Sequence, residues 1–460
     1  MHPINPGGRM SPDQPLRAAL LSMHTDPAST LGGDVTGGMN VYVREVAKAL
    51  PALGVEADVY TRAESGELPV AEELAPGAYL VRIPAGPLES LDKNLQLQFT
   101  EAFASGINHF ADKEGLAYGV ISSHYWLSAV AGKTLSKNWG VPLAHRFHTI
   151  AARKNDSLPG GKGRESVERI LAENKIAGEA DALIASSTAE ATDLREKLGA
   201  EETKIFQVPC GVDTERFTPM PRAEARATLG LSKDEKIILA AGRIEPVKGL
   251  DRLVEALAAI KKSHPDIKVR VIHIGGETTE ENRTSQGLSP GAFSSTAQRE
   301  EVSRILDIAN EAGQARDFHF LGAKSQETLR AYYSAADALA VPSRYETFGL
   351  VALEAAACEL PAVAFDVGGI SSNIETGKTG YIVPDGDNIA FAEAMMRIID
   401  SADEKKRLGN MARSRAESLS WSSAAEAEIR IWEKLIQRRG GAASAADKAA
   451  DAASPPGVPA

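Results

Sequence analysis

Short apolar runs alternate with helix-length amphipathic segments along most of the chain, and this alternation limits the folds open to it. Parallel strands need long crossover connections, usually helices, so the alternation favours helix-covered parallel sheets. The strand candidates are 18–23, 57–60, 120–123, 143–147, 182–185 and 204–208 in the first half, and 237–241, 268–274, 317–321, 338–341, 362–365 and 381–383 in the second. Helical patterns lie between them, for example at 39–53, 95–110, 127–139 and 165–179. The sequence therefore predicts an α/β protein with two doubly wound, Rossmann-like domains.

The boundary between the two domains is expected in the turn-rich stretch 209–221, which contains three prolines and a glycine. Proline fixes φ and removes a backbone donor, so such a stretch is typical of a linker. The predicted domains are therefore 16–209 and 222–421, joined by 210–221. The last amphipathic helix, 422–438, is expected to pack back on the first domain.

Three further segments are expected to lack regular structure. Residues 1–15 are rich in Pro and Gly, and residues 440–460 are almost all Ala, Gly, Ser, Asp and Pro. Both tails carry too little apolar surface to offset the entropy lost on ordering, and we expect them to be disordered. The polar segment 275–295 is expected to be a long, disordered surface loop.

Composition excludes several classes of protein. The formal net charge of −11 argues against a general nucleic-acid binder, so any anionic ligand needs a local basic site. No apolar run approaches the ~20 residues of a transmembrane helix, and the N-terminus lacks the layout of a signal peptide. Two cysteines, Cys210 and Cys358, give no disulfide framework, and the expected location is the cytoplasm.

A pair of carboxylates marks one candidate site in the second half. Glu346 and Glu354 bracket Gly349, where an apolar strand turns into a helix. The helix N-terminus offers N–H groups to an anion, and ionised carboxylates accept hydrogen bonds from sugar hydroxyls. The pattern indicates a site for a phosphorylated sugar or a sugar nucleotide, although a solvated helix face would read similarly.

A pair of cations marks a second turn of the same kind. Arg243 and Lys248 follow another apolar strand, just before the helix that begins near Gly249. Ligands of open α/β sheets bind at the carboxyl ends of strands, and two cations there could neutralise a diphosphate. The alternative is a pair of exposed basic residues, which the flanking glycine turn disfavours.

The first half offers a glycine pair, Gly37 and Gly38, at the start of a helix. It is not the spaced dinucleotide fingerprint, and Arg62 stands where that fingerprint expects an acidic residue, so a dehydrogenase is disfavoured. His148 follows a strand end, as a residue of a cleft would, although a lone histidine is more often a core residue. Lys93, Lys154 and Arg169 supply basic groups to the same domain, and the alternative is that they are simply solvated.

With these residues in view, the chain resembles the family 4 retaining glycosyltransferases of the GT-B fold, in which two Rossmann-like domains face a central cleft. Within that family it is most similar to the inositol-phosphate N-acetylglucosaminyltransferases that start mycothiol synthesis. The resemblance covers nearly everything from Arg17 to Arg438, and its segments are 37–43, 91–93, 123–128, 139–143, 148–149, 154–155 and 169–173. The longer loop after Ile274 and the Ser343-Arg-Tyr run depart from the pattern, which bears on the sugar more than on the reaction.

The resemblance implies a donor site. Arg243 and Lys248 would hold the donor diphosphate, with the Gly38 amide on the other side. Glu346 would bind hydroxyls of the transferred sugar, and Glu354 would bind the ribose. Backbone groups of Phe348, Gly349 and Leu350 would contact the sugar and the diphosphate. His148 would lie near the sugar 6-hydroxyl. The implied catalytic residues are His148, Arg243, Lys248 and Glu346.

The resemblance also implies an acceptor site. Lys93, Tyr125, Thr149 and Arg169 match positions that bind the acceptor phosphate, and Asn40 a position that binds a ring hydroxyl. No metal site is implied: Mg²⁺ is compatible with the reaction but is not required. The expected partners are a nucleotide sugar and a phosphorylated polyol, and the expected assembly is a homodimer.

The implied reaction is a retaining sugar transfer, with N-acetylglucosamine from UDP-GlcNAc and 1D-myo-inositol 3-phosphate as the expected substrates. One alternative is a transfer like that of sucrose-phosphate synthases, with glucose or mannose moved to a sugar phosphate. An alternative of another class is a nucleotide-sugar epimerase, which would need a base aimed at the sugar ring. A non-catalytic binding protein is disfavoured because Arg243, Lys248, Glu346 and Glu354 all occur together.

Overall fold

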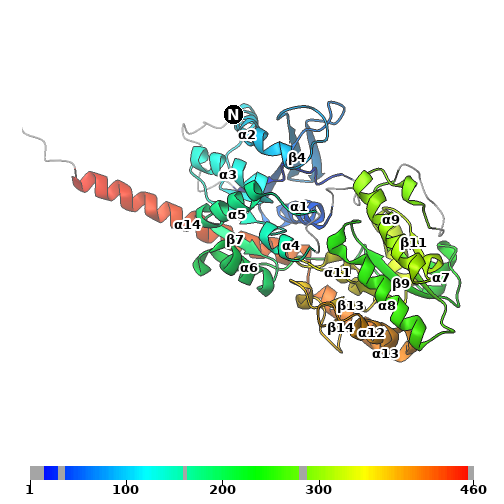
Figure 1. Ribbon diagram of the computed structural model, residues 1–460. Helices are drawn as coiled ribbons and strands as arrows, with labels where there is room; N and C mark the ends of the chain where they lie inside the picture. The colour runs from blue at the N-terminus through cyan, green and yellow to red at the C-terminus, as the bar shows by residue number, and fades with distance from the viewer. Residues whose placement is uncertain (1–14, 30–36, 159–162, 279–286, 454–460) are drawn as a thin grey trace, which may run out of the picture.

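The computed structural model describes residues 15–29, 37–158, 163–278 and 287–453, and these residues form two α/β domains that lie side by side (Figure 1). Each domain is built on its own sheet, with helices on both faces. The prediction of two Rossmann-like domains is confirmed. Residues 1–14, most of the tail expected to be disordered, lie outside the described residues.

The first domain contains an eight-stranded sheet in the order β3-β4-β2-β1-β5-β6-β7-β8. Its strands are β1 (Arg17–Leu21), β2 (Glu56–Arg62), β3 (Ala71–Ala75), β4 (Ala78–Ile83), β5 (Val120–His124), β6 (Leu143–Arg146), β7 (Ala182–Ala185) and β8 (Ile205–Gln207). Its helices are α1 (Gly38–Ala49), α2 (Thr100–Glu114), α3 (Trp126–Trp139), α4 (Ala151–Asp156), α5 (Val167–Glu179) and α6 (Thr188–Leu198). All neighbouring strands pair in parallel except β3, which is antiparallel to β4 at the sheet edge.

The second domain contains a six-stranded parallel sheet in the order β11-β10-β9-β12-β13-β14. Its strands are β9 (Lys236–Ala241), β10 (Val269–Ile274), β11 (Phe318–Phe320), β12 (Ala338–Val341), β13 (Ala362–Phe365) and β14 (Gly380–Val383). Its helices are α7 (Arg222–Thr228), α8 (Leu250–Ser263), α9 (Thr296–Glu311), α10 (Gln326–Ala335), α11 (Leu350–Ala357), α12 (Asn388–Asp400) and α13 (Ala402–Glu417).

Each parallel sheet is buried on both faces, which explains the continuous apolar runs of the strands. In β1, Ala18 and Leu20 belong to one buried cluster and Ala19 and Leu21 to another, because successive side chains point to opposite faces. The pattern fails to reveal β3, an edge strand whose residues are mostly exposed, and its partner β4. Exposure explains the omission of β3 only, because five of the six residues of β4 are buried and β4 lies between β3 and β2.

The chain passes between the domains twice, and the two crossings lie against each other. The Val212 amide donates to the Leu419 carbonyl at 2.9 Å. A Cβ on Gly211 would lie 2.4 Å from the Trp421 nitrogen, so only glycine allows this approach. The segment between β8 and α7 and the segment between α13 and α14 (Trp421–Ala453) thus form a double connection.

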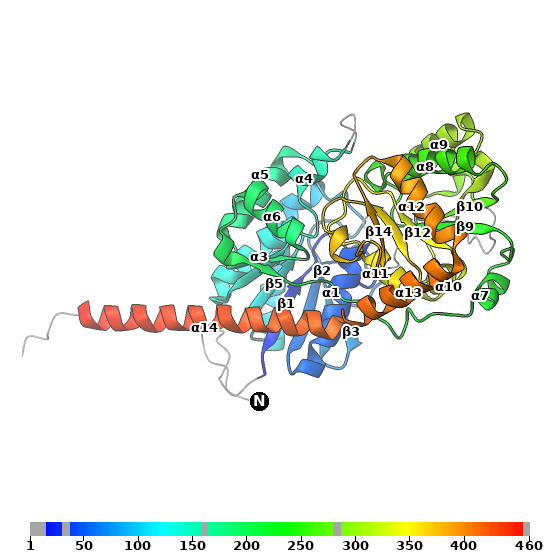
Figure 2. The same ribbon diagram turned by 90° about the horizontal axis from the view of Figure 1, so that it is seen from below.

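Helix α14 returns to the first domain and extends beyond it (Figure 2). Within the first domain, the Tyr42 hydroxyl donates to Glu428, a buried residue of α14, and Arg146 lies 3.6 Å from the same carboxylate. The prediction of disorder from residue 440 is wrong for 440–453, where α14 continues. Alanine has the highest helix propensity, and an Ala-rich tract that follows a formed helix needs no new nucleus. Residues 454–460 lie outside the described residues.

The long polar segment 275–295 is only partly described, since 279–286 lie outside. Its two ends are ordered: Thr278 forms a β-bridge with Phe293, and Phe293 is fully buried. The expectation of a disordered loop is therefore wrong for both ends. In the described part of the chain, no helix combines the length and apolar character that crossing a membrane requires.

Candidate active site

Two glycine turns of the second domain pack on each other and define the donor side of the site. Gly249 begins α8 with φ of 66°, and a Cβ there would lie 2.1 Å from the Pro342 carbonyl oxygen. Glycine therefore permits the turn after β9 to touch the turn after β12. The contact brings Lys248 onto Glu346, and the two form an ion pair.

Glu346 is held in place by a second donor, the Ser343 hydroxyl, at 3.0 Å. Gly349 precedes α11 with φ of 83°, and a Cβ there would lie 2.2 Å from Ile370 Cδ1. The carbonyl of Phe348 accepts from Asn373 at 2.5 Å. The turn that carries Glu346 into α11 is thus closely packed.

Arg243 lies between this turn and the glycine pair of the first domain. Its guanidinium donates to Glu245 at 2.7 Å, and a Cβ on Gly37 would lie 3.8 Å from Arg243 Nε. A Cβ on Gly38 would lie 3.2 Å from Leu350 Cδ1. Gly38 therefore lets the start of α1 approach the start of α11 closely, and Gly37 lies beside the Arg243 side chain.

Glu245 sits among several cations. Burial alone would raise the pKa of its carboxyl, but Arg243, Lys154 and Lys248 outweigh burial and lower it. Lys154 Nζ, from the first domain, is 3.7 Å from Glu245, which places an ion pair across the domain boundary.

Glu354 is buried, with 8% of its surface exposed. Burial raises the pKa of its carboxyl to about 7. The hydrogen bond that Tyr333 donates at 2.9 Å and the charge of Arg216 lower this pKa, but by less than burial raises it. Glu354 and Leu350 line a cavity of 10 Å³, and Arg216 and Gln326 line both this cavity and an interdomain groove of 350 Å³. Glu354 is therefore one layer of side chains away from the groove.

His148 and Tyr125 follow adjacent strands, β6 and β5, and both have left-handed backbone conformations, with φ of 60° and 70°. Such strain in non-glycine residues clusters at functional sites. The His148 carbonyl accepts from Thr347 of the second domain at 2.6 Å, so this strand end lies at the domain junction.

The ring of His148 is neutral. Its Nε2 lies 3.0 Å from Nδ1 of His124, and burial, with the nearby charge of Arg146, keeps the pKa of both rings well below the usual value. A neutral imidazole can donate or accept one hydrogen bond at each nitrogen, as a hydroxyl ligand requires.

Asn40 makes three hydrogen bonds within the protein. Its amide nitrogen donates to Thr25 Oγ1 at 2.8 Å and to the Asp26 carbonyl at 2.9 Å, and its oxygen accepts from the Gly37 amide at 3.0 Å. Both amide hydrogens are used within the protein. Asn40 therefore braces the glycine pair, and only its oxygen has capacity left for a ligand.

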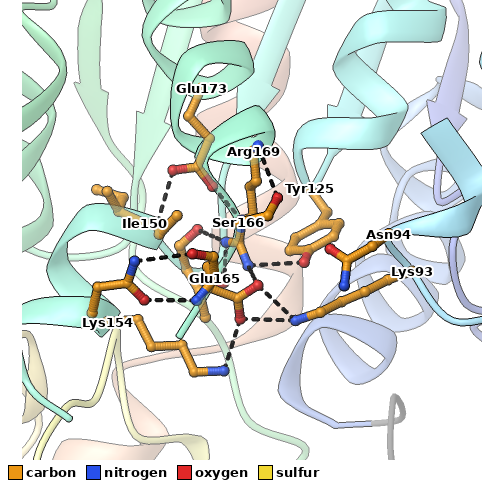
Figure 3. A network of polar contacts seen from close by, with 12 residues as sticks. Lys93, Asn94, Tyr125, Ile150, Lys154, Glu165, Ser166, Arg169 and Glu173 are labelled. Carbon is orange, nitrogen blue, oxygen red and sulfur yellow. Dashed lines mark hydrogen bonds and ion pairs between the residues drawn. The ribbon is translucent and has the colours of Figure 1, made fainter. Parts of the chain in front are cut away.

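The residues expected to bind a phosphate converge on one point (Figure 3). Lys93, from the loop before α2, and Arg169, from the first turn of α5, both contact the carboxylate of Glu165. Lys154, from α4, contacts the same carboxylate at 2.9 Å. Burial would raise the pKa of Glu165, but Arg169, Lys154 and Lys93 hold it far below the ordinary value.

Arg169 organises the rest of this cluster. Its guanidinium donates to the Tyr125 hydroxyl at 2.9 Å, to Thr149 Oγ1 at 2.9 Å and to Glu173 at 2.7 Å. The guanidinium also lies over the Tyr125 ring, 4.6 Å from its centroid. Only 1% of the Arg169 side chain is exposed, so its orientation is fixed before any ligand binds.

Sequence reasoning missed several residues of the site. Glu165 is central to the phosphate cluster, Thr347 joins the domains, and Lys154 received no role. His24 follows β1 and stacks on Tyr125 with ring centroids 4.1 Å apart, while burial lowers the pKa of its imidazole to about 3. The position of His24 after a buried strand was the one signal that could have identified it.

Among the described residues, no group of three or more His, Cys, Asp or Glu side chains is placed to hold a metal ion. Asp387, from the Asp-Gly-Asp run at 385–387, accepts from the Ala390 amide at 2.9 Å and caps α12.

The chain matches two families along its length. Residues 37–211 match the family described as "Glycosyl transferase 4-like domain", and residues 221–415 match "Glycosyl transferases group 1". The gap between the two matches falls in the connection between β8 and α7.

Relatives match over nearly the full chain. The D-inositol 3-phosphate glycosyltransferase of Nocardia farcinica is 37% identical, over 92% of this chain and 90% of its own. That of Corynebacterium jeikeium is 38% identical, over 91% and 97%. The sucrose-phosphate synthase of Thermosynechococcus elongatus has a TM-score of 0.80 at 30% identity, covering 92% of this chain and all of its own. The chain therefore belongs to the family 4 glycosyltransferases with the GT-B fold.

Proposed function

We propose that the protein transfers N-acetylglucosamine from UDP-GlcNAc to 1D-myo-inositol 3-phosphate with retention of anomeric configuration, the reaction that starts mycothiol synthesis. The relatives named D-inositol 3-phosphate glycosyltransferase, at about 37% identity, support the acceptor. The observation that carries the proposal is the convergence of Lys93, Lys154 and Arg169 on a single buried anion position.

The cluster suits a phosphate better than a neutral hydroxyl. The ammonium of Lys93 is a point charge on a side chain that is 28% exposed, whereas the planar guanidinium of Arg169 is buried. Tyr125 and Thr149 add hydroxyls beside the guanidinium. Charge-assisted hydrogen bonds are roughly twice as strong as neutral ones, so an acceptor without phosphate would forfeit most of the interaction.

On the donor side, Arg243 and Lys248 are proposed to neutralise the diphosphate as it leaves. Lys248 would break its ion pair with Glu346 and form one with the diphosphate. The Glu346 carboxylate would then be free to accept hydrogen bonds from the sugar. His148 would contact the sugar through its neutral ring, and Glu354 would accept from the ribose. Two side-chain cations and the start of α11 supply the charge stabilisation, so Mg²⁺ is proposed to be dispensable.

The direct test incubates the protein with UDP-GlcNAc and either inositol 3-phosphate or inositol, and measures UDP release and the anomeric coupling of the product. We expect efficient turnover of the phosphorylated acceptor only, an α-linked product, and activity that survives EDTA. Similar efficiencies for the two acceptors would contradict the assignment of the phosphate cluster.

The same assay separates two alternatives. The sucrose-phosphate synthase likeness favours fructose 6-phosphate as a competing acceptor, with glucose or mannose as the sugar. An epimerase would interconvert nucleotide sugars without releasing UDP. The cytoplasm, where nucleotide sugars are available, is the proposed location. The homodimer stays a prediction, and light scattering would test it.

A further inference from the structure

Glu165 occupies the position where the acceptor phosphate is expected. Both carboxylate oxygens lie 2.8 Å from Lys93 Nζ, Oε1 lies 2.9 Å from Lys154 Nζ, and Oε2 lies 3.0 Å from Arg169 Nη1 (Figure 3). The Glu165 side chain is 3% exposed, so the carboxylate fills the centre of the cluster and is not a rim residue. It makes the contacts that a phosphate would make.

The charges of the cluster do not accommodate both anions. Lys93, Lys154 and Arg169 supply three positive charges, and Glu165 and Glu173 supply two negative ones. Glu245, 3.7 Å from Lys154, is also paired with Arg243, so these two together add no net charge. A phosphate dianion added to this set would leave an excess of negative charge in a buried site, whereas a dianion in place of Glu165 would leave the set neutral. Buried charges need compensation, so exchange is favoured over addition.

We propose that the Glu165 carboxylate is a built-in substitute for the acceptor phosphate, which holds the cluster assembled in the free enzyme and is displaced when the acceptor binds. The inference rests on the proposed function only for the identity of the acceptor. The competition between the carboxylate and a phosphate follows from the geometry of the cluster alone.

The surroundings let the side chain leave while the cations stay. Asn155 clamps the backbone of Glu165 from both sides: its oxygen accepts from the Glu165 amide at 2.7 Å, and its nitrogen donates to the Glu165 carbonyl at 3.1 Å. Arg169 is held independently by Glu173 and Thr149. Rotation of the Glu165 side chain therefore suffices, and the clamp keeps the carboxylate close enough to return.

This exchange adds to acceptor selectivity. A ligand reaches the cations only by displacing Glu165. Its apparent affinity is therefore its intrinsic affinity multiplied by the fraction of molecules in which the carboxylate has left the cluster. A phosphate recovers the lost ion pairs. A neutral polyol instead leaves Lys93 without the carboxylate it contacts, and leaves Arg169 and Lys154 with only Glu173 and Glu245 as carboxylate partners. Glu165 therefore opposes unphosphorylated polyols more strongly than phosphorylated ones.

The experiment compares the wild type with Glu165→Gln, using inorganic phosphate as the calorimetric probe and inositol 3-phosphate in the kinetic assay. Removing a charge a few ångströms from another ion typically changes an equilibrium by about tenfold or more. We expect Glu165→Gln to bind phosphate about tenfold more tightly and to show a lower KM for inositol 3-phosphate at similar kcat. The matched control is Glu168→Gln, an exposed residue in the first turn of α5, three positions after Glu165, which should leave both values unchanged.

Weaker or unchanged phosphate binding in Glu165→Gln would overturn the proposal, because Glu165 would then support the bound phosphate. A structure of the wild type with phosphate provides a second test that needs no variant to fold. The proposal requires the carboxylate to have left Arg169 and Lys93, and a bound phosphate with both contacts intact would refute it. If the acceptor assignment alone were wrong, phosphate would still displace Glu165 although inositol 3-phosphate would not turn over.

Discussion

Replacing Glu354 with glutamine should remove a pH dependence from nucleotide binding. The pKa of Glu354 is raised to about 7, so the carboxyl titrates near neutral pH. Hydroxyls of a ribose donate to the ionised form best, and the ionised fraction grows about tenfold between pH 6 and pH 8. Wild-type protein should therefore bind UDP about tenfold more tightly at pH 8 than at pH 6, and release about half a proton on binding at pH 7.

Calorimetry with UDP in two buffers of different ionisation enthalpy measures both quantities. UDP has its own phosphate titration near pH 6, and Glu354→Gln is the control that retains it. At pH 6 the variant should bind UDP about as tightly as the wild type, and at pH 8 about tenfold less tightly. If wild type and variant show the same pH dependence, Glu354 does not contact the nucleotide in its ionised form, and the assignment is refuted.

The same carboxyl affects folding stability in a defined direction. Its folded pKa is above the unfolded value of 4.5, so the folded state retains a proton that the unfolded state has released between pH 4.5 and about 7. Stability from this group is complete below pH 4.5 and is lost as the pH rises through 7. The difference in pKa corresponds to about 3 kcal/mol, so Glu354→Gln should be more stable than the wild type at pH 8 by up to that amount.

Three further outcomes are expected. Lys248→Ala and Arg243→Ala should each lower kcat by about 100-fold or more, because each cation stabilises charge on the leaving diphosphate. The control, Lys378→Ala at an exposed site, should leave kcat unchanged. Wild-type rates in the first two variants would refute the donor site. UDP should reduce the radius of gyration in solution scattering as the two domains close, and an unchanged radius at saturation would count against closure. Glu428→Ala should destabilise the protein by about 3 kcal/mol in denaturant unfolding, because it leaves Arg146 buried without its carboxylate; a change under 1 kcal/mol would contradict this.

The sequence predicts the two sheets well because every strand of a covered parallel sheet is apolar on both faces. The twelve expected strands correspond to β1, β2 and β5–β14. The exposed edge strand β3 lacks this apolar pattern, whereas β4 is mostly apolar and buried and was missed in spite of it. The turns that carry Arg243, Lys248 and Glu346 were predictable for a related reason. Each follows a buried strand directly, and glycine marks the point where the backbone turns.

The phosphate cluster was only partly predictable. Lys93 and Glu165 are 72 residues apart, and nothing in either local pattern indicates that they pair. The resemblance supplied the cations and hydroxyls because they bind the ligand, but it did not supply the carboxylate that pairs with them when the ligand is absent. Asn40 was assigned to the acceptor for its position, while its hydrogen bonds depend on the fold of the preceding loop.

The return of α14 to the first domain has a consequence for synthesis of the protein. Domains generally fold in order as the ribosome releases them. Here Arg146 and Tyr42 of the first domain find their carboxylate in Glu428, which leaves the ribosome only after the whole second domain. Until translation is nearly complete, Tyr42 and Arg146 have each other but lack the carboxylate of Glu428. A chain released early would carry two sheets but an unfinished first domain, which makes premature termination products natural targets for chaperones and proteases.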